Sequence, residues 1–465
     1  MKKIATLYAL LLLHLVATAQ LQLPSFFSDH MILQQQQKVA VWGSDRPNTT
    51  VAVTCSWGAK ATTVTDANGR WKVRVATPQA GGPYYLEIKG SNTIQLQDVL
   101  IGEVWLCSGQ SNMEMPMKGW ANQPIEGGKE AILNSANNAI RFFNATKTSA
   151  ITPQYDVKGK WQIADSTTTG NASATAYFFA RKLQSILKVP VGILHTSWGA
   201  STIESWMDAA ALQAVKPNLP MPQELPSKDP NRTPTIMYNA MLHPFVGYGI
   251  KGFAWYQGEA NRANANEYQA LFSTMISTWR MQWGMGKLPF YFVQIAPFGY
   301  KDLNAGYLRE AQQQTMLTVP NTGMVVTLDV GEQASIHPRK KQQVGERLAA
   351  WALAETYHQQ DVNAKSPLYK KAIFQKNGTV VVQFKNVGAG LKMQEQSITG
   401  FEIAGEDQKF YPAIATVDAK HNKVKVWSEQ VKTPVAVRYC FQNWCEGTLF
   451  SIDGIPAAPF RTDAW

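Results

Sequence analysis

Four apolar segments of the chain each end in a cluster of small polar residues whose side chains could catalyse acyl transfer. The clusters cover residues 108–116, 195–201, 255–261 and 329–338. In open α/β sheets ligands bind beyond the carboxyl ends of the strands, so clusters that follow parallel strands share one crevice. These clusters supply hydroxyls, glycine amides, a carboxamide and an imidazole, which is the set of groups that a serine hydrolase uses.

Ser111 is the predicted nucleophile. A serine at a strand-to-helix turn can present its oxygen to a substrate while a nearby backbone N–H faces the developing oxyanion, and Gly109 would permit the close approach. The alternative role for Ser111 is that of a helix N-cap, which serine also favours. Ser108, which is closer to the apolar segment, is the weaker candidate.

His337 is the predicted general base that accepts the proton of Ser111, because an imidazole titrates near neutral pH. The chain contains seven histidines, and a capping or core position is the alternative for this one. His195 and His243 are competing candidates. His195 ends an apolar run and is better explained as a packed side chain.

Gly199, Gln257 and the backbone of Ser111 are the predicted oxyanion donors. Fixed donors around the tetrahedral oxygen contribute about 2.7 to 4 kcal/mol each to catalysis. Gln257 could instead brace neighbouring loops, and Glu259 is either such a brace or a charged neighbour of the site. The chain has no CxxC pair and no HExxH, GxGxxG or Walker motif, so we expect neither a metal nor another cofactor.

The segments that precede these clusters have the composition of strands buried on both faces, with nearly continuous apolar runs. Stretches with helical spacing of apolar residues lie between them. This alternation predicts a doubly wound α/β domain with a parallel sheet. The predicted strands are 99–107, 189–195, 250–256, 288–295 and 324–328, and the predicted helices are 174–188, 267–283 and 344–357.

Short strands with alternating apolar and polar residues flank this domain on both sides. Turn signals such as Asn68-Gly69 and Asn377-Gly378 separate the strands. We therefore expect a β-sandwich at each end of a central α/β domain. The predicted division is a leader at 1–19, an N-terminal β-sandwich at 20–97, a catalytic domain at 98–360 and a C-terminal β-sandwich at 361–465.

Residues 1–19 have the features of a secretory signal peptide. Lys2 and Lys3 precede an apolar core, and Ala17-Thr18-Ala19 matches a cleavage site. No other apolar run is long enough to span a bilayer. We therefore expect a periplasmic or secreted protein with no membrane attachment after cleavage.

Charge and cysteine content restrict the partners of the chain. Its 465 residues carry a formal net charge of +11, but lysine and arginine form no stripe, and the densest run, residues 339–341, is expected on a solvated surface. We therefore expect no nucleic-acid partner. Of the four cysteines, Cys440 and Cys445 are the predicted disulfide, whereas buried free thiols are at least as reasonable for Cys55 and Cys107.

Five motifs in the chain resemble those of the sialate O-acetylesterase family, within the SGNH hydrolase superfamily. The motifs are residues 101–116, which include the string GQSNMEMP, and residues 195–199, 255–259, 335–339 and 459–463. The resemblance implies that the central domain is an SGNH-type catalytic domain with Ser111 and His337 as catalytic residues. It also implies hydrolysis of acetyl esters on sugar hydroxyls, with O-acetylated sialic acid as the substrate. Within the motifs, Asn112 and Glu259 join the candidate oxyanion and substrate-binding residues.

The chain departs from the family pattern at the carboxylate that would orient the catalytic histidine. Many relatives in the superfamily carry an aspartate three residues before this histidine, where the chain has Ala334, and the close family often has an acidic residue at the position of Ser335. Glu332 is the favoured replacement and Asp329 the second. A backbone carbonyl could also hold the ring and leave a Ser–His dyad, which would lower the rate without abolishing the chemistry.

Two other functions fit the same sequence. The first is an acetylesterase for a plant polysaccharide such as xylan or pectin, because specificity resides in loops that sequence patterns do not shape. The second is a glycan-binding protein without catalytic activity, because two of the three predicted domains are β-sandwiches.

Overall fold

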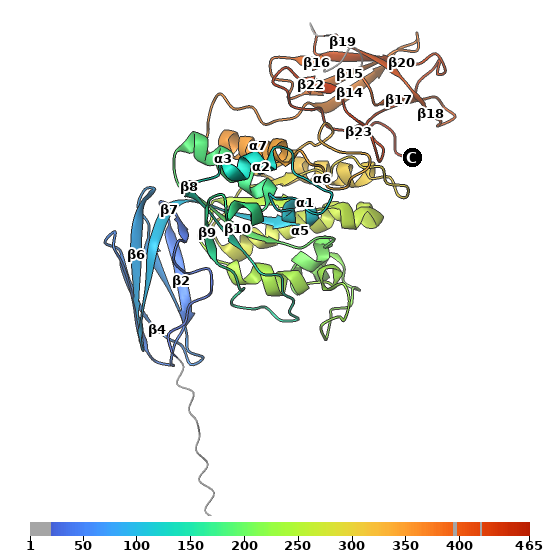
Figure 1. Cartoon of the computed structure of the whole chain (residues 1–465). Helices are drawn as coiled ribbons and strands as arrows, with labels where there is room; N and C mark the ends of the chain where they lie inside the picture. Colours follow the sequence, from blue (N-terminus) through green and yellow to red (C-terminus); the bar gives the residue numbers. More distant parts are fainter. Residues whose placement is uncertain (1–19, 394–397, 419–420) are drawn as a thin grey trace, which may run out of the picture.

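The computed structural model describes residues 20–393, 398–418 and 421–465, so the predicted leader lies outside the described residues. The chain has a mixed α/β fold with a large central sheet and several smaller sheets. The N-terminal and C-terminal strands lie on opposite sides of the central part (Figure 1). Within the described residues, no helix has the length and apolar character needed to cross a bilayer.

All five predicted strands of the central sheet are present. Neighbouring strands run parallel except at one edge, where β9 is antiparallel to β8. The sequence pattern missed β8 and β9, in which polar residues interrupt the apolar run. In spatial order the strands are β13 (Thr322–Val325), β12 (Phe290–Val293), β11 (Gly252–Tyr256), β7 (Thr93–Gly109), β10 (Val191–Ser197), β8 (Asn137–Asn144) and β9 (Trp161–Ala164).

The predicted helices are α3 (Ala174–Leu187), α5 (Ala265–Trp283) and α7 (Lys341–Trp351), the last of which continues as a π-helix over Ala352–Thr356. The apolar side chains of α3 and α7 pack in one core cluster and those of α5 in another. The sheet is therefore covered on both faces, as the pattern predicted. Helix α6 (Gly306–Thr318) was not predicted, because its buried side chains include arginine and glutamine and blur the apolar period.

Strand β7 crosses the predicted boundary between the N-terminal and central domains without a break. Its first half pairs with β6 (Gly81–Lys89), and its second half pairs with β10 and β11. Asp98, at the expected boundary, has a positive φ of 50° and accepts a 3.0 Å ion pair from Arg141, which is almost fully buried. The junction is therefore a continuous strand with a buried clamp, and not a linker.

The remaining N-terminal strands form two antiparallel arrangements. In the first, β2 pairs with β5. In the second, β3 pairs with both β4 and β6. The short β1 pairs in parallel with β7. Cys55 ends β3 as a buried free thiol, and Cys107 in β7 is also free and buried. The strand bounds are β1 (Ile32–Gln34), β2 (Lys38–Ser44), β3 (Thr50–Cys55), β4 (Lys60–Val64) and β5 (Arg70–Ala76).

The described residues of the C-terminal part form two four-stranded antiparallel sheets and a two-stranded one. Cys440 and Cys445 form the predicted disulfide. The first sheet contains β14 (Leu368–Phe374), β15 (Val380–Lys385), β20 (Lys423–Trp427) and β19 (Ile414–Asp418). The second contains β18 (Phe410–Pro412), β17 (Phe401–Ala404), β21 (Ala436–Tyr439) and β23 (Phe460–Arg461), and the pair is β16 (Leu391–Met393) with β22 (Leu449–Ser451).

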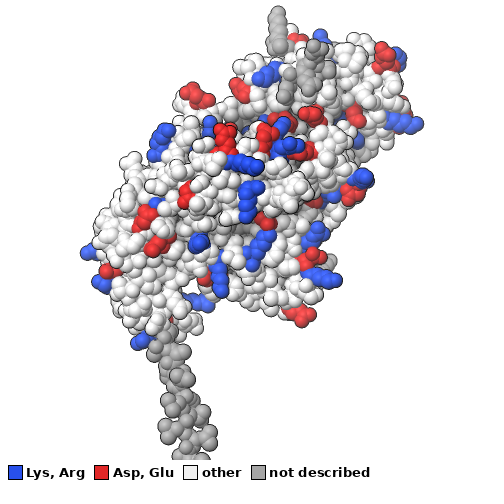
Figure 2. All heavy atoms as spheres, viewed as in Figure 1, with Lys and Arg blue, Asp and Glu red and all other residues white. Residues whose placement is uncertain are grey.

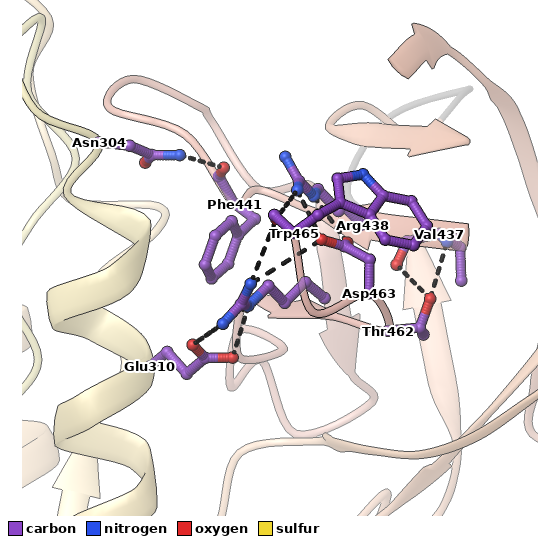
Figure 3. A network of polar contacts seen from close by, with 9 residues as sticks. Asn304, Glu310, Val437, Arg438, Phe441, Thr462, Asp463 and Trp465 are labelled. Carbon is purple, nitrogen blue, oxygen red and sulfur yellow. Dashed lines mark hydrogen bonds and ion pairs between the residues drawn. The ribbon is translucent and has the colours of Figure 1, made fainter. Parts of the chain in front are cut away.

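The end of the chain attaches this C-terminal part to α6 (Figure 3). Arg461 donates hydrogen bonds from Nε and Nη2 to the carboxylate of Glu310 on α6, each at 3.0 Å. Asp463, whose side chain is fully buried, pairs with Arg438 of β21 at 2.6 Å. The motif at 459–463 therefore has a structural role at the contact between two parts of the fold.

Acidic and basic side chains are both scattered over the face of the molecule shown in Figure 2, and several lysine and arginine side chains follow one another down its centre. The densest run of basic residues, 339–341, was expected on a solvated surface. One part of the expectation is wrong. Lys341, in the run expected on a solvated surface, is fully buried.

Replacement of Glu310 by alanine should weaken the attachment of the C-terminal part. The two-pronged contact with Arg461 is lost, so we expect a loss of about 1–2 kcal/mol in the free energy of unfolding. Chemical denaturation followed by tryptophan fluorescence measures it. The matched control is Glu346→Ala, because Glu346 lies 3.9 Å from Arg181 in an exposed pair and its removal should change stability by less than about 0.5 kcal/mol. Equal losses in the two variants would contradict the role of the contact.

Candidate active site

The carboxyl end of β7 carries the candidate nucleophile into helix α1 (Ser111–Glu114). Gly109 has a φ of 143°, and a Cβ at this position would lie 2.2 Å from the carbonyl oxygen of Tyr256 on β11. The next residue, Gln110, accepts a hydrogen bond from Gly258 N–H on its side-chain oxygen at 3.1 Å. Only glycine allows β7 and β11 to approach this closely, and the approach fixes the turn before Ser111.

Ser111 is the first residue of α1, and the N-cap position is taken by Gln110. Ser111 is therefore not the N-cap of α1, and that alternative is wrong. Its side chain is partly exposed and its Oγ has no hydrogen-bond partner in the described part of the chain. Ser108, the weaker candidate, is fully buried and out of reach of a substrate.

The ring of His337 is held by Gln123. Its Nδ1 lies 2.8 Å from Oε1 of Gln123, and Trp120 packs edge-on at 4.9 Å between ring centroids. A carboxamide oxygen only accepts hydrogen bonds, so Nδ1 carries the proton and Nε2 has the free lone pair that a general base needs. Burial, together with the positive charge of Lys341, lowers the pKa of His337 from 6.5 to about 4.

A buried amide connects the segments that carry Ser111 and His337. Asn112 follows Ser111 directly, is fully buried, and donates from Nδ2 to the carbonyl of Ile336 at 3.1 Å. The same nitrogen donates to Oε1 of Glu259 at 2.6 Å. The residue after the hydroxyl and the residue before the imidazole are therefore bonded to each other.

The two carboxylates expected to orient His337 have other partners. Glu332 accepts hydrogen bonds from the backbone and the guanidinium of Arg339 at 2.8 and 3.2 Å. Asp329 forms a two-pronged pair with Arg347 at 2.6 and 2.8 Å. The favoured assignment of Glu332 is thus replaced by Gln123, a neutral residue that the sequence analysis missed because it lies 214 positions away in a segment without a regular pattern.

Gly199 lies against Ser111, as expected, but its N–H has a partner. A Cβ on Gly199 would be 3.4 Å from Cβ of Ser111. The N–H donates to Oε2 of Glu114 at 2.5 Å, and the other oxygen of Glu114 contacts Nζ of Lys147 at 2.5 Å. A substrate must displace this carboxylate before Gly199 can donate to an oxyanion.

Gln257 has the bracing role that was the alternative to an oxyanion donor. It is fully buried, and its Nε2 donates to the carbonyl of Ser201 at 3.0 Å and to Oδ1 of Asn261 at 2.8 Å. Its Oε1 accepts from the hydroxyl of Tyr268 at 2.7 Å. Both amide hydrogens are therefore engaged. Glu259 is also buried, which raises its pKa.

The competing histidines are placed differently. His195 lies 2.6 Å from Oγ of Ser197 through Nε2 and 3.1 Å from Oδ1 of Asn144 through Nδ1. Ser197 is only 4% exposed, so this hydroxyl is closed to a substrate. His243 contacts the backbone carbonyl of Gln154 at 2.7 Å. Neither histidine faces an accessible serine through a contact that the structure records.

Comparison with known proteins identifies the family. Residues 101–354 match the family described as "Carbohydrate esterase, sialic acid-specific acetylesterase". The chain is 29% identical to the sialate O-acetylesterase of Mus musculus, covering 94% of this chain and 93% of that protein. It is 28% identical to the sialate O-acetylesterase of Homo sapiens, covering 94% and 91%.

A solved structure supports the same assignment. The crystal structure of a carbohydrate acetylesterase from Xanthomonas citri superposes with a TM-score of 0.87 at 38% identity, covering 96% of this chain and all of that one. The predicted resemblance and the prediction of an enzyme are confirmed, and the alternative without catalytic activity is set aside. The chain belongs to the sialic acid-specific acetylesterase family of carbohydrate esterases and is a carboxylic-ester hydrolase.

Proposed function

We propose that this esterase is exported and removes O-acetyl groups from sugars, with O-acetylated sialic acid as substrate and a covalent acetyl intermediate on Ser111. The observation that carries the proposal is the hydrogen bond from Asn112 to the carbonyl of Ile336. It joins the neighbours of the candidate nucleophile and the candidate base. The signal-type leader supports export, and the named activities of the relatives in mouse and human support the sugar substrate.

In the proposed first half-reaction, Nε2 of His337 accepts the proton of Ser111 while Oγ attacks the acetyl carbonyl. The backbone N–H of Ser111 opens α1 and is free of the helical ladder, so it is available to the oxyanion. Gly199 becomes a second donor when the carbonyl oxygen displaces Glu114. Collapse of the tetrahedral species breaks the ester bond, and the imidazolium returns its proton to the departing sugar oxygen.

In the second half-reaction, water attacks the acetyl group on Ser111 while His337 accepts a proton from that water. The bond to Oγ then breaks, acetate leaves, and the proton returns to Ser111. Gln123 keeps the ring in the required tautomer throughout but supplies no negative charge to the imidazolium. This orienter is weaker than a carboxylate, so the proposed machinery is a Ser–His pair with a neutral third member.

Ser111→Ala should lower the turnover of 4-nitrophenyl acetate by at least about 10³-fold, because the variant has no nucleophile to form the acetyl intermediate. Steady-state kinetics with a thermal melt to confirm folding measure this. Ser197→Ala is the matched control, since Ser197 contacts a histidine at 2.6 Å but is buried. Near-wild-type activity in Ser111→Ala, or an equal loss in Ser197→Ala, would reject the assignment.

The pH dependence of kcat/KM should report the low pKa of His337. Only the neutral ring can accept a proton, so activity should stay constant from neutral pH down to about 5 and fall by half near pH 4. Gln123→Glu places a carboxylate on Nδ1, which favours the charged ring and should move this acid limb upward by about 1–2 units. The control is Gln359→Glu, which makes the same charge change at an exposed site. A wild-type limb near pH 6.5, or identical limbs in the two variants, would contradict the prediction.

A panel of acetylated glycans tests the substrate. We expect the highest kcat/KM for acetate release from O-acetylated sialic acid, compared with acetylated xylan and acetylated pectin, and no release above background by Ser111→Ala. Faster release from xylan or pectin would favour the plant-polysaccharide alternative. That result would not contradict the acyl-enzyme proposal. The comparison among glycans tests the substrate, whereas the comparison of wild type with Ser111→Ala tests the nucleophile.

A further inference from the structure

Lys341 is buried directly behind the candidate catalytic residues. It is the first residue of α7 and has no exposed surface. Its Nζ lies 2.5 Å from Oδ1 of Asn112 and 5.4 Å from the centroid of the Tyr256 ring. In the described part of the chain, no carboxylate lies within ion-pair distance of Nζ. A buried ammonium without an ion pair is costly, and burial lowers the pKa of Lys341 from 10.5 to about 7.

The contact with Lys341 determines which way the amide of Asn112 faces. The amino group of Lys341 can donate to an oxygen in either protonation state, and its charged form cannot accept a hydrogen bond. It therefore selects the amide oxygen and directs the NH₂ group toward Glu259 and Ile336. A flipped amide would set NH₂ against the ammonium and its oxygen against two acceptors. Every hydrogen bond that the amide makes would then be lost.

We propose that Lys341 is a positioning residue, which locks the amide of Asn112 so that the segment before His337 stays bonded to the turn that carries Ser111. This inference rests on the proposed roles of Ser111 and His337. It adds Lys341, which takes no part in the acetyl-transfer steps proposed above. Loss of the lock leaves both catalytic groups in place but loosens their mutual geometry. Misplacement of reacting groups by about 1 Å can lower a rate 10²-fold.

Lys341 also acts on His337 through its charge. Its positive charge disfavours the imidazolium and so lowers the pKa of the ring. The atoms in direct contact with the ring, those of Gln123 and Trp120, are uncharged. Charged groups on the neighbouring segments include the ion pairs Glu332–Arg339 and Asp329–Arg347, and Lys340 beside Lys341. They also include Lys118 and Glu126 on the segment that carries Gln123, Glu114 on α1, and Glu259 bonded to Asn112.

Lys341→Met tests the proposal because it removes the ammonium and keeps a stem of similar volume. We expect kcat for 4-nitrophenyl acetate to fall about 10–100-fold with KM within about twofold. The acid limb of kcat/KM should rise by about one pH unit as the repulsion on His337 disappears. The matched control is Lys340→Met, which removes the same charge one residue away. Among the described residues, the hydrogen bond recorded for Nζ of Lys340 is with the carbonyl of Asp329 at 3.4 Å.

A double-mutant cycle separates positioning from general destabilisation. If Lys341 acts through the amide, Asn112→Ala should lower kcat as much as Lys341→Met, and the double variant should be no worse than either. Additive losses, or a Lys341→Met enzyme with unchanged kcat and an unmoved acid limb, would overturn the proposal. Should Lys341→Met not fold, Asn112→Ala decides alone, and an unchanged kcat in that variant would overturn it.

A failure of the proposed function would be recognised separately. NMR titration of the His337 ring, identified by its loss in His337→Gln, needs no turnover. A ring pKa that rises in Lys341→Met but not in Lys340→Met supports the influence of Lys341 even if Ser111→Ala retains activity. A ring pKa that is the same in wild type and Lys341→Met contradicts it whatever the enzyme hydrolyses.

Discussion

The geometry of the candidate site depends on one buried carboxamide, that of Asn112. Its Oδ1 accepts from Lys341, and its Nδ2 donates to Glu259 and to the carbonyl of Ile336. These partners come from α7, from the segment after β11 and from the segment before His337. Each buried polar group left without a hydrogen bond would lower the stability of the fold by about 1–3 kcal/mol. The hydrogen bonds of Asn112 therefore fix the positions of these three segments relative to one another.

Nδ1 of His337 faces the neutral carboxamide of Gln123 and not a carboxylate, whose negative charge would raise the pKa of the ring. Gln123 adds no negative charge, Lys341 adds a positive one, and burial acts in the same direction, so the pKa of the ring falls to about 4. A ring with this pKa is neutral at almost any pH that the protein would meet, but it attracts a proton weakly. In proton transfer the optimum is a pKa near the working pH. For the proposed general base, this arrangement therefore gives a broad pH range at the cost of base strength.

Sequence patterns predicted the frame of the molecule better than its polar contacts. The five central strands and three helices were found because apolar periodicity records which faces are buried. The pattern could not show that Lys341 is buried beside exposed Arg339, since both are cations in one short run. Nor could it find Gln123, because a side chain that orients a histidine from a distant loop leaves no local signal. Glu332, the nearest carboxylate in sequence, is bonded to Arg339 instead.

The parts outside the central sheet are joined to the site through rigid elements. Strand β7 pairs with the N-terminal strands and leads into the turn that carries Ser111, so the two parts are connected through one continuous strand. On the other side, α6 is bonded to Arg461 through Glu310, and two residues further along the helix Gln312 donates to the carbonyl of Gln257 at 3.0 Å. Gln257 in turn holds Ser201, beside the loop of Gly199. This chain of contacts explains why a glutamine with the chemistry of an oxyanion donor is fully occupied. The same contacts connect the C-terminal strands to the loop that contacts Ser111.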